Sequence, residues 1–283
     1  MKFAVKLSLV ILSVYFAAAI FGEVQYRLAQ SRDVIAAYNV VDLSARYLPP
    51  SAEHWLGTDN LGRDVGLRLI QGARIAFIVG VATSILAIFL GTLFGLLGGY
   101  FGGKTDSVVV WLSSTVASMP GLLFILAISL VVGKGIWGVI AGIGLTTWVG
   151  VCRTIRAEVM KHRERAYVQA ARVLGYSHAR IMFRHILPNV AHIILIQFSI
   201  RFPSAVSTEV FISFLGIGVQ GEPSWGIMIN NARLRLWQGV WWEMAFTTLA
   251  IFLLVMAFNQ LADYLRDRLD PALRSETAAP CHS

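Results

Sequence analysis

Residues 76–98 read AFIVGVATSILAIFLGTLFGLLG, and this stretch decides the fold. It is uncharged and longer than the roughly 20 residues that a helix needs to cross a bilayer core of about 30 Å. In such a core only helices and closed barrels satisfy every backbone N–H and C=O, and barrel strands show about ten residues of alternating polarity. A continuous apolar run of this length therefore predicts a membrane-spanning helix.

The composition extends this prediction to the whole chain. Hydrophobic residues make up 56% of the 283 residues and charged residues 14%, against roughly 25% charged in soluble proteins. Mean hydropathy is +0.65. Six apolar stretches are long enough to span a membrane: 3–20, 76–98, 108–132, 136–152, 189–216 and 244–262. We predict an all-α polytopic membrane protein with about six transmembrane helices.

Basic residues set the predicted orientation. The segment 153–184 holds eight Lys or Arg and two acids, and such segments stay on the cytoplasmic side. With four spans before it and two after it, both termini are predicted to be cytoplasmic. The first stretch, residues 1–21, resembles a secretory signal, but we expect a retained helix because the rest of the chain is itself polytopic.

The stretch YVQAARVLGYSHARIMFRHILPN, residues 167–189, is the most informative one outside the predicted spans. Good helix formers precede Gly175, which breaks the run, and Pro188 ends a second short helix. We therefore predict two short helices around a glycine turn. Small side chains at Ala170 and Ala171 permit close approach by another surface, which indicates a docking element.

A family resemblance follows from this stretch. Gln169-Ala170-Ala171-x3-Gly175 followed by Leu187-Pro188 resembles the E-A-A-x3-G-x9-I-x-L-P signature of permease subunits of bacterial ABC importers. Further segments are similar to the peptide and nickel importer permeases, in the order of that family: HWLGTDNLGRDV (54–65), GARIAF (72–77), GYFGG (99–103), RHILPN (184–189), SFLGIGVQ (213–220), PSWGIMI (223–229) and FNQLADYLRDRLDP (258–271).

The resemblance implies that residues 165–187 form coupling helices, which sit in a groove of a separate ATP-hydrolysing subunit. The residues that match the signature, with the arginine beside them, are Gln169, Ala170, Ala171, Arg172, Gly175, Leu187 and Pro188. Two residues depart from it: Gln169 replaces the usual Glu, and His185 stands where the signature has Ile. Gln169 can still form a hydrogen bond, but not the ion pair of a glutamate.

The predicted spans and orientation divide the chain, and the resemblance implies the importer type and a set of partners. Residues 22–75 are external, 76–270 form a permease core of the type I importer kind, and 271–283 form a cytoplasmic tail. The expected partners are a second homologous permease, two ABC ATPases, an extracytoplasmic solute-binding protein and membrane lipid, in a bacterial inner membrane. The chain itself is expected to be non-catalytic and to bind no cofactor, with ATP and Mg on the ATPases. Basic residues at 153–184 are explained by orientation and docking, so no nucleic acid is expected.

Polar residues inside predicted spans are costly and mark candidate functional sites. Arg201 lies about 18 Å along a helix from Asn189, near mid-membrane, and Glu209 is only about 80° around the helix from Arg201. Both can therefore face one interior cavity and line a translocation path, or each can be neutralised by a neighbouring helix. Pro120 and Pro203 fall inside predicted spans and permit a kink.

The external stretch LGTDNLGRDV, residues 56–65, offers turn glycines with exposed Asp59, Arg63 and Asp64. Contact with a solute-binding protein and an internal salt-bridged turn explain these residues equally well. A second external segment, residues 217–243, contains a tryptophan cluster that suits a membrane interface.

Two other patterns lead to no site. GGYFGGKT, residues 98–105, satisfies the phosphate-loop pattern G-x-x-x-x-G-K-[ST], but a predicted span rather than a strand precedes it, so we expect a tight turn. His178, His185 and His192 recur every seven residues, yet no paired carboxylate or cysteine stands at metal-ligand spacing, so no metal site is expected. The alternative to an ABC permease is an ion-coupled secondary transporter that uses its intramembrane charges.

Overall fold

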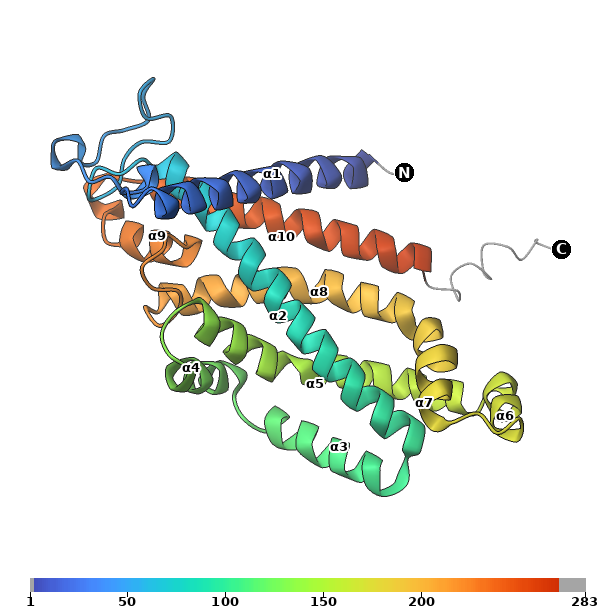
Figure 1. The fold of residues 1–283 in the computed structure, drawn as a ribbon. Coiled ribbons are helices and arrows are strands. Elements are labelled where there is room, and N and C mark those ends of the chain that lie inside the picture. Colours follow the sequence, from blue (N-terminus) through green and yellow to red (C-terminus); the bar gives the residue numbers. More distant parts are fainter. Residues whose placement is uncertain (1–2, 270–283) are drawn as a thin grey trace.

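The computed structural model describes residues 3–269, and the predicted tail 271–283 lies outside them. Within the described range the chain is helical, with no strand and one isolated β-bridge between Thr58 and Asp64. Five long helices form the bundle in Figure 1: α1 (Phe3–Ser31), α2 (Val65–Phe101), α5 (Ile136–Arg163), α8 (Leu187–Phe214) and α10 (Trp242–Leu269). All five are long and apolar enough to cross a membrane.

Short elements lie between the long helices and at both ends of the bundle. They are η1 (Ala37–Asn39), η2 (Leu43–Ala45), α3 (Gly103–Ala117), α4 (Gly121–Val132), α6 (Ala166–Val173), α7 (His178–Arg180), the π-helical η3 (Ile181–Ile186), α9 (Trp225–Arg233) and η4 (Leu236–Gln238). Figure 1 shows α6 and α9 at opposite ends. We call these the α6 end and the α9 end.

The predicted span 108–132 is not a straight helix. It is divided between α3 and α4, which are bent by 92° at their break. Pro120 stands at the break, immediately before α4. Proline has no N–H to donate and disfavours helical geometry in the residue before it, so a continuous helix through this point would lose a hydrogen bond and meet a steric clash. The structure thus has five spans, or six with this bent pair counted as one.

Two long helices extend farther than the apolar stretches predicted. α1 continues to Ser31, and α2 begins at Val65, so the connection between them is residues 32–64 rather than 22–75. Two polar side chains near the start of α2 contact α1: Gln71 Nε2 donates to the Gly22 carbonyl at 3.0 Å, and Arg74 pairs with Glu23 at 2.6 Å. Hydropathy alone did not predict the first turns of α2 as part of a membrane-spanning helix, because a hydropathy scale counts Gln71 and Arg74 as unfavourable and takes no account of their partners in α1.

Glycines bring α2 and α5 into close contact. Gly91, Gly95 and Gly99 lie one turn apart on α2. A Cβ atom on Gly91 would lie 2.5 Å from Val151 Cβ, and one on Gly95 would lie 2.9 Å from Ile155 Cβ, both on α5. Small residues at this spacing let membrane helices approach closely without a hydrophobic driving force.

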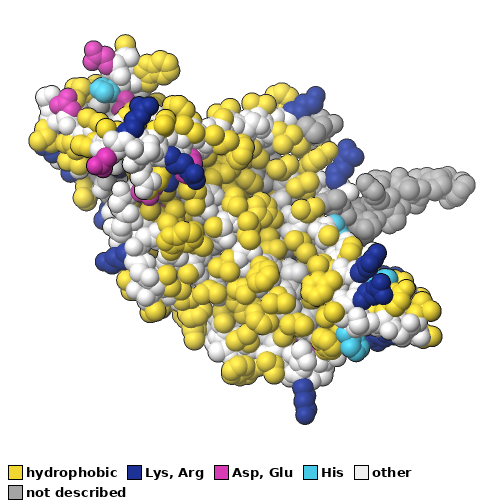
Figure 2. All heavy atoms as spheres, viewed as in Figure 1, with side chains coloured by type: hydrophobic (Ala, Val, Ile, Leu, Met, Phe, Trp, Pro, Cys, Tyr) yellow, Lys and Arg dark blue, Asp and Glu magenta, His cyan; other side chains and the backbone are white. Residues whose placement is uncertain are grey.

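Apolar side chains cover most of the visible face between the two ends, and charged side chains gather toward the ends (Figure 2). One buried cluster near the α9 end surrounds Phe202 and Trp225. A second cluster, which includes Ile155 and Ile181, joins α2, α5 and the short elements of the α6 end. This second cluster ties residues 165–187 to the bundle.

Candidate functional site

Residues 165–187 form the candidate docking element, which we call the α6–η3 segment. α6 ends before Gly175, whose φ of +77° is a conformation that L side chains rarely adopt. The N–H of Gly175 donates to the Arg172 carbonyl at 2.9 Å, and that of Tyr176 donates to the Ala171 carbonyl at 3.1 Å. Ser177 then caps α7 by accepting from the Arg180 N–H. The predicted helix and glycine turn are therefore present.

The predicted end of the second short helix at Pro188 is wrong. α7 continues through the π turn η3 into α8, and the combined helix runs from His178 to Phe214. Pro188 lies in the first turn of α8, and the Leu187 N–H donates to the Met182 carbonyl, five residues back. A proline has no N–H to donate, and a π turn before it tolerates the missing hydrogen bond. The helix therefore continues through Pro188 with a locally changed hydrogen-bond spacing.

One face of the α6–η3 segment is buried in the bundle. Val168, Ile181 and Ile186 are fully buried beside α2 and α5, and Ala171 is 3% exposed. The expectation that Ala171 lies open to another surface is therefore wrong: its small side chain allows α6 to pack on its own chain. Ala170 remains exposed.

The opposite face of the segment exposes apolar side chains. Val173 is 88% exposed and Leu174 70%. Phe183, which is 57% exposed, lies instead with Leu187 in an apolar groove formed with α2 and α8. Sequence reasoning missed Val173 and Leu174, although the signal was present in two consecutive apolar residues directly before the helix-ending Gly175. Arg172, Arg180 and Arg184 are exposed near them, as are Gly175 and Pro188.

Polar contacts attach the α6–η3 segment to the bundle. The buried Tyr100 of α2 shares a 2.9 Å hydrogen bond with His178 Nδ1, and the Arg172 guanidinium lies 5.4 Å from the Tyr100 ring centre. Gln169 Nε2 donates to the Arg163 carbonyl at 3.2 Å, so it caps the end of α5 within the chain. Burial raises the pKa of Tyr167, which keeps its hydroxyl protonated.

The two polar residues predicted on the fifth span lie on α8 in different surroundings. Glu209 is 1% exposed, and the Ser213 hydroxyl one turn on donates to its Oε1 at 2.7 Å. Arg201 lines a narrow hollow between α2, α5 and α8, and Glu209 does not line it. The structure therefore does not bring the two side chains into one cavity, and their part in a translocation path stays a prediction.

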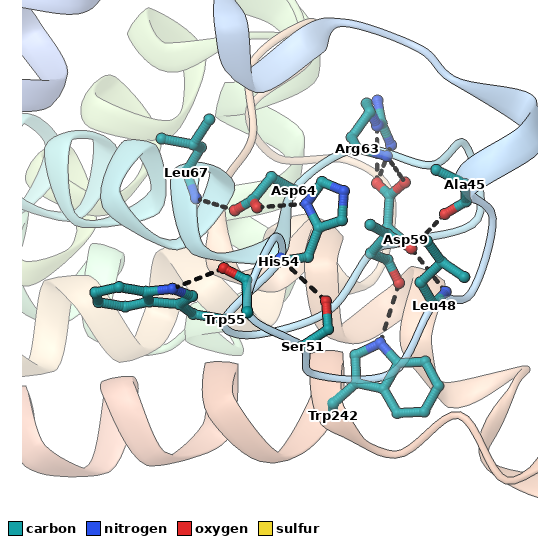
Figure 3. A network of polar contacts seen from close by, with 12 residues as sticks. Ala45, Leu48, Ser51, His54, Trp55, Asp59, Arg63, Asp64, Leu67 and Trp242 are labelled. Atoms are coloured by element: carbon teal, nitrogen blue, oxygen red, sulfur yellow. Dashed lines mark hydrogen bonds and ion pairs between the residues drawn. The ribbon is translucent and has the colours of Figure 1, made fainter.

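The predicted external contact residues belong to an internal network, shown in Figure 3. Asp59 is 1% exposed, so the expectation that it is open to a partner is wrong. Its Oδ1 accepts from the Arg63 N–H at 3.0 Å, and its Oδ2 pairs with the Arg63 guanidinium at 2.7 Å and with Arg68 at 3.5 Å. The adjacent Thr58 carbonyl accepts from the Trp242 indole at 3.0 Å, which ties this turn to α10.

Asp64 joins the same turn to α2. Its Oδ1 accepts from the Leu67 N–H at 2.9 Å and caps the helix, and its Oδ2 lies 2.9 Å from His54 Nδ1 (Figure 3). These contacts favour the internal salt-bridged turn of the two interpretations of this stretch. A binding-protein contact through the exposed edges of Arg63 and Asp64 stays a prediction.

The phosphate-loop pattern at residues 98–105 has a helix on both sides. α2 runs through Phe101, and α3 begins at Gly103, so a helix does open at Lys104, contrary to the expected start at Val108. The preceding element is nevertheless a helix, and Gly102 and Gly103, with φ of +67° and +51°, form the tight turn expected between them. A strand leading into the loop is what phosphate binding requires, and α2 stands in its place.

Two of the three periodic histidines have separate neighbours. His178 bonds to Tyr100, and His185 stacks on Tyr176 with ring centres 5.6 Å apart. Among residues 3–269, no three His, Cys, Asp or Glu side chains are grouped to hold a metal ion.

Five or six membrane-crossing helices, with a short helix and glycine turn at one end, define the class as a polytopic α-helical membrane protein. Residues 87–275 match the family described as the inner membrane component of binding-protein-dependent transport systems. The chain belongs to this family.

Curated relatives agree with this assignment. The chain is 38% identical to the dipeptide transport system permease protein DppC of Bacillus subtilis (strain 168), over 82% of this chain and 73% of the relative. It is 36% identical to the glutathione transport system permease protein GsiD of Pectobacterium atrosepticum, over 84% and 79%.

Two solved structures share the fold. An amino acid ABC transporter with histidines gives a TM-score of 0.53 at 16% identity, covering 71% of this chain and 94% of that chain. The inward-facing MetNI methionine ABC transporter gives 0.56 at 15% identity, covering 72% and 96%.

Proposed function

We propose that the chain is the permease subunit of an ATP-driven importer of peptides, working in a bacterial inner membrane with both termini in the cytoplasm. The names of the relatives support a peptide cargo, and family membership favours the importer over an ion-coupled transporter. The expected complex contains a second homologous permease, two ABC ATPases that hold ATP and Mg, and an extracytoplasmic binding protein. This chain is a non-catalytic part of it, surrounded by membrane lipid.

The observation that carries this proposal is the two-sided α6–η3 segment. Its inner face is continuous with the buried core of α2 and α5, through residues such as Val168 and Ile181, and its outer face exposes Val173 and Leu174. An exposed apolar pair next to the exposed Arg172 fits a groove on a partner protein. Because the inner face is closely packed on α2 and α5, a displacement of the segment by the partner protein also displaces these membrane helices.

The experiment replaces one exposed anchor. We expect Leu174→Asp to lower co-purification of the ATPase subunits at least about tenfold, because a charge in the centre of an apolar contact is desolvated without a partner. ATP-dependent peptide uptake should fall with it. The matched control is Ile35→Asp, which adds the same charge to a 75% exposed side chain in the 32–64 connection.

Normal ATPase association in Leu174→Asp would contradict the docking assignment. Uptake by the wild-type complex that survives removal of ATP and collapses with the proton gradient would contradict the importer and support the ion-coupled transporter instead.

A further inference from the structure

The hollow between α2, α5 and α8 is polar and carries one positive charge. Hydroxyl groups of Thr83, Ser84, Thr147 and Ser204 line it together with Arg201. No acidic residue of the described chain lines it, and Arg201 is in no ion pair among residues 3–269. An arginine inside a membrane-spanning helix is expected to face a partner of opposite charge or a polar cavity, and here it faces the cavity.

Two polar groups in this hollow have no hydrogen-bond partner. Arg201 Nε and Ser84 Oγ are both buried, and neither bonds to any described residue. The hollow is narrow, and in this conformation no water molecule fits inside it. Water therefore cannot satisfy these groups here, and buried donors without partners are costly. Both groups are therefore free to donate to an acceptor that enters between α2, α5 and α8.

The adjoining helix leaves room for the guanidinium. A Cβ on Gly150 of α5 would lie 2.5 Å from Arg201 Nη2, so the glycine allows the guanidinium to lie flat against α5. Next to Arg201, Ser204 and Ser207 are exposed on α8. Ser204, which lines the hollow, is thus also accessible from outside it.

We infer that this hollow binds the carboxylate of the cargo during its passage, with Arg201 and Ser84 as donors. The inference rests on the proposed import of peptides and names the chemical group that this part of the path recognises. An unmodified linear peptide carries a terminal carboxylate, and a guanidinium with a nearby hydroxyl donates charge-assisted hydrogen bonds to it. In a site of low dielectric, without a competing acid, this attraction is strong.

The test compares two cargoes in the complete complex reconstituted with its binding protein. The probes are a peptide with a free C-terminal carboxylate and the same peptide as its C-terminal amide, chosen so that the binding protein binds both. The measured quantity is the ratio of their ATP-dependent uptake rates. Because wild type and variants share one binding protein, its own preference cancels when the ratios are compared.

We expect Arg201→Gln to lower the acid-to-amide ratio at least about tenfold, the effect of losing a charge-assisted pair. Arg201→Lys, which keeps the charge but not the planar fork, should retain part of the preference. Lys104→Gln is the matched control, since it removes one positive charge from an exposed residue of α3 and should leave the ratio unchanged.

Gly150→Ala tests the geometry with the charge retained. The added Cβ displaces the guanidinium, so the ratio should fall while the complex assembles. If the Arg201→Gln complex fails to assemble, the uptake ratio of Gly150→Ala still tests whether Arg201 binds the carboxylate.

An unchanged ratio in an assembled Arg201→Gln complex that still imports both peptides overturns the inference and leaves the proposed function intact. A second result also overturns the inference: the Arg201→Gln complex loses the second permease, and the uptake ratio is unchanged in Gly150→Ala. Arg201 would then pair with an acidic residue of the second permease and not with the cargo. Absence of ATP-dependent uptake of either peptide by the wild type would instead contradict the proposed function.

Discussion

At the scale of single residues, the two oxygens of the Asp64 carboxylate bond to two different parts of the chain. One caps α2 through the Leu67 N–H, and the other contacts His54 in the connection that covers the α9 end. Asp59 nearby is enclosed by the arginines 63 and 68. Residues that looked like an exposed binding surface are therefore holding the start of α2 in place.

The cap gives a prediction for Asp64. We expect Asp64→Ala to lower the free energy of unfolding by about 1 kcal/mol, because the Leu67 N–H loses its acceptor. Asp64→Asn is the matched variant, since its amide oxygen still caps the helix while the charge toward His54 is lost; it should cost less. Thermal unfolding of the purified complex measures both. Equal losses for the alanine and asparagine variants would show that the contact with His54, rather than the cap, is what stabilises this turn.

At the scale of elements, the contact between α2 and α5 depends on the absence of side chains. The backbone of α5 lies so close to Gly95 that an added Cβ would be 3.0 Å from the Cys152 carbonyl oxygen and 2.9 Å from Ile155 Cβ. Neither neighbour is the end of a flexible side chain, so the helices themselves must separate. α2 and α5 also carry the cluster that anchors the α6–η3 segment, so their spacing bears on that segment's position.

We expect Gly95→Ala to destabilise the protein by about 1–3 kcal/mol, as overpacking in a close-packed core does. The control is Gly121→Ala at the start of α4, where an added Cβ meets nothing within 4 Å. There the higher helix propensity of alanine should leave stability unchanged or slightly raised. Thermal unfolding of the two purified variants separates the effects, and a Gly95→Ala variant as stable as Gly121→Ala would contradict the close contact.

At the scale of the whole molecule, the two ends of the bundle differ in what they expose. The α6 end carries the exposed Val173 and Leu174, and Figure 1 places the start of α1 and the end of α10 on the same side. The α9 end carries Trp237, which is 96% exposed, whereas Trp242 is 6% exposed and packs in the core. Opposite ends of a membrane protein face different compartments, so the proposed orientation can be measured directly.

In cells that express the permease without the ATPase subunits, which would otherwise cover Val173, we expect a membrane-impermeant maleimide to label Trp237→Cys in intact cells and Val173→Cys only after permeabilisation. Both positions are highly exposed, at 96% and 88%, so access to the compartment rather than burial determines labelling. The native Cys152 is 1% exposed and gives little background, and Cys281 is replaced by Ser in both variants. Labelling of Val173→Cys in intact cells would reverse the proposed orientation.

Composition and hydropathy were sufficient for the helical membrane class, and the spacing around Gly175 was sufficient for the glycine turn. Both are local properties: an apolar run that satisfies its own backbone needs no partner to be a helix. A positive φ at a glycine likewise follows from the absence of a Cβ. For the same reason, the motif around 169–188 identified the family without any knowledge of packing.

The packing of distant segments determined the rest. Asp59 is buried because Arg63 and Arg68 enclose its carboxylate, and Ala171 is buried because α6 lies on α2 and α5. The helix passes Pro188 through a π turn, whereas the break at Pro120 bends the chain by 92°. Pro188 and Pro120 both disfavour a continuous helix, yet the helix continues at the first and is broken at the second. The free energy of a polar or helix-breaking residue depends on the neighbours that satisfy it, and those neighbours come from elements far away in the sequence.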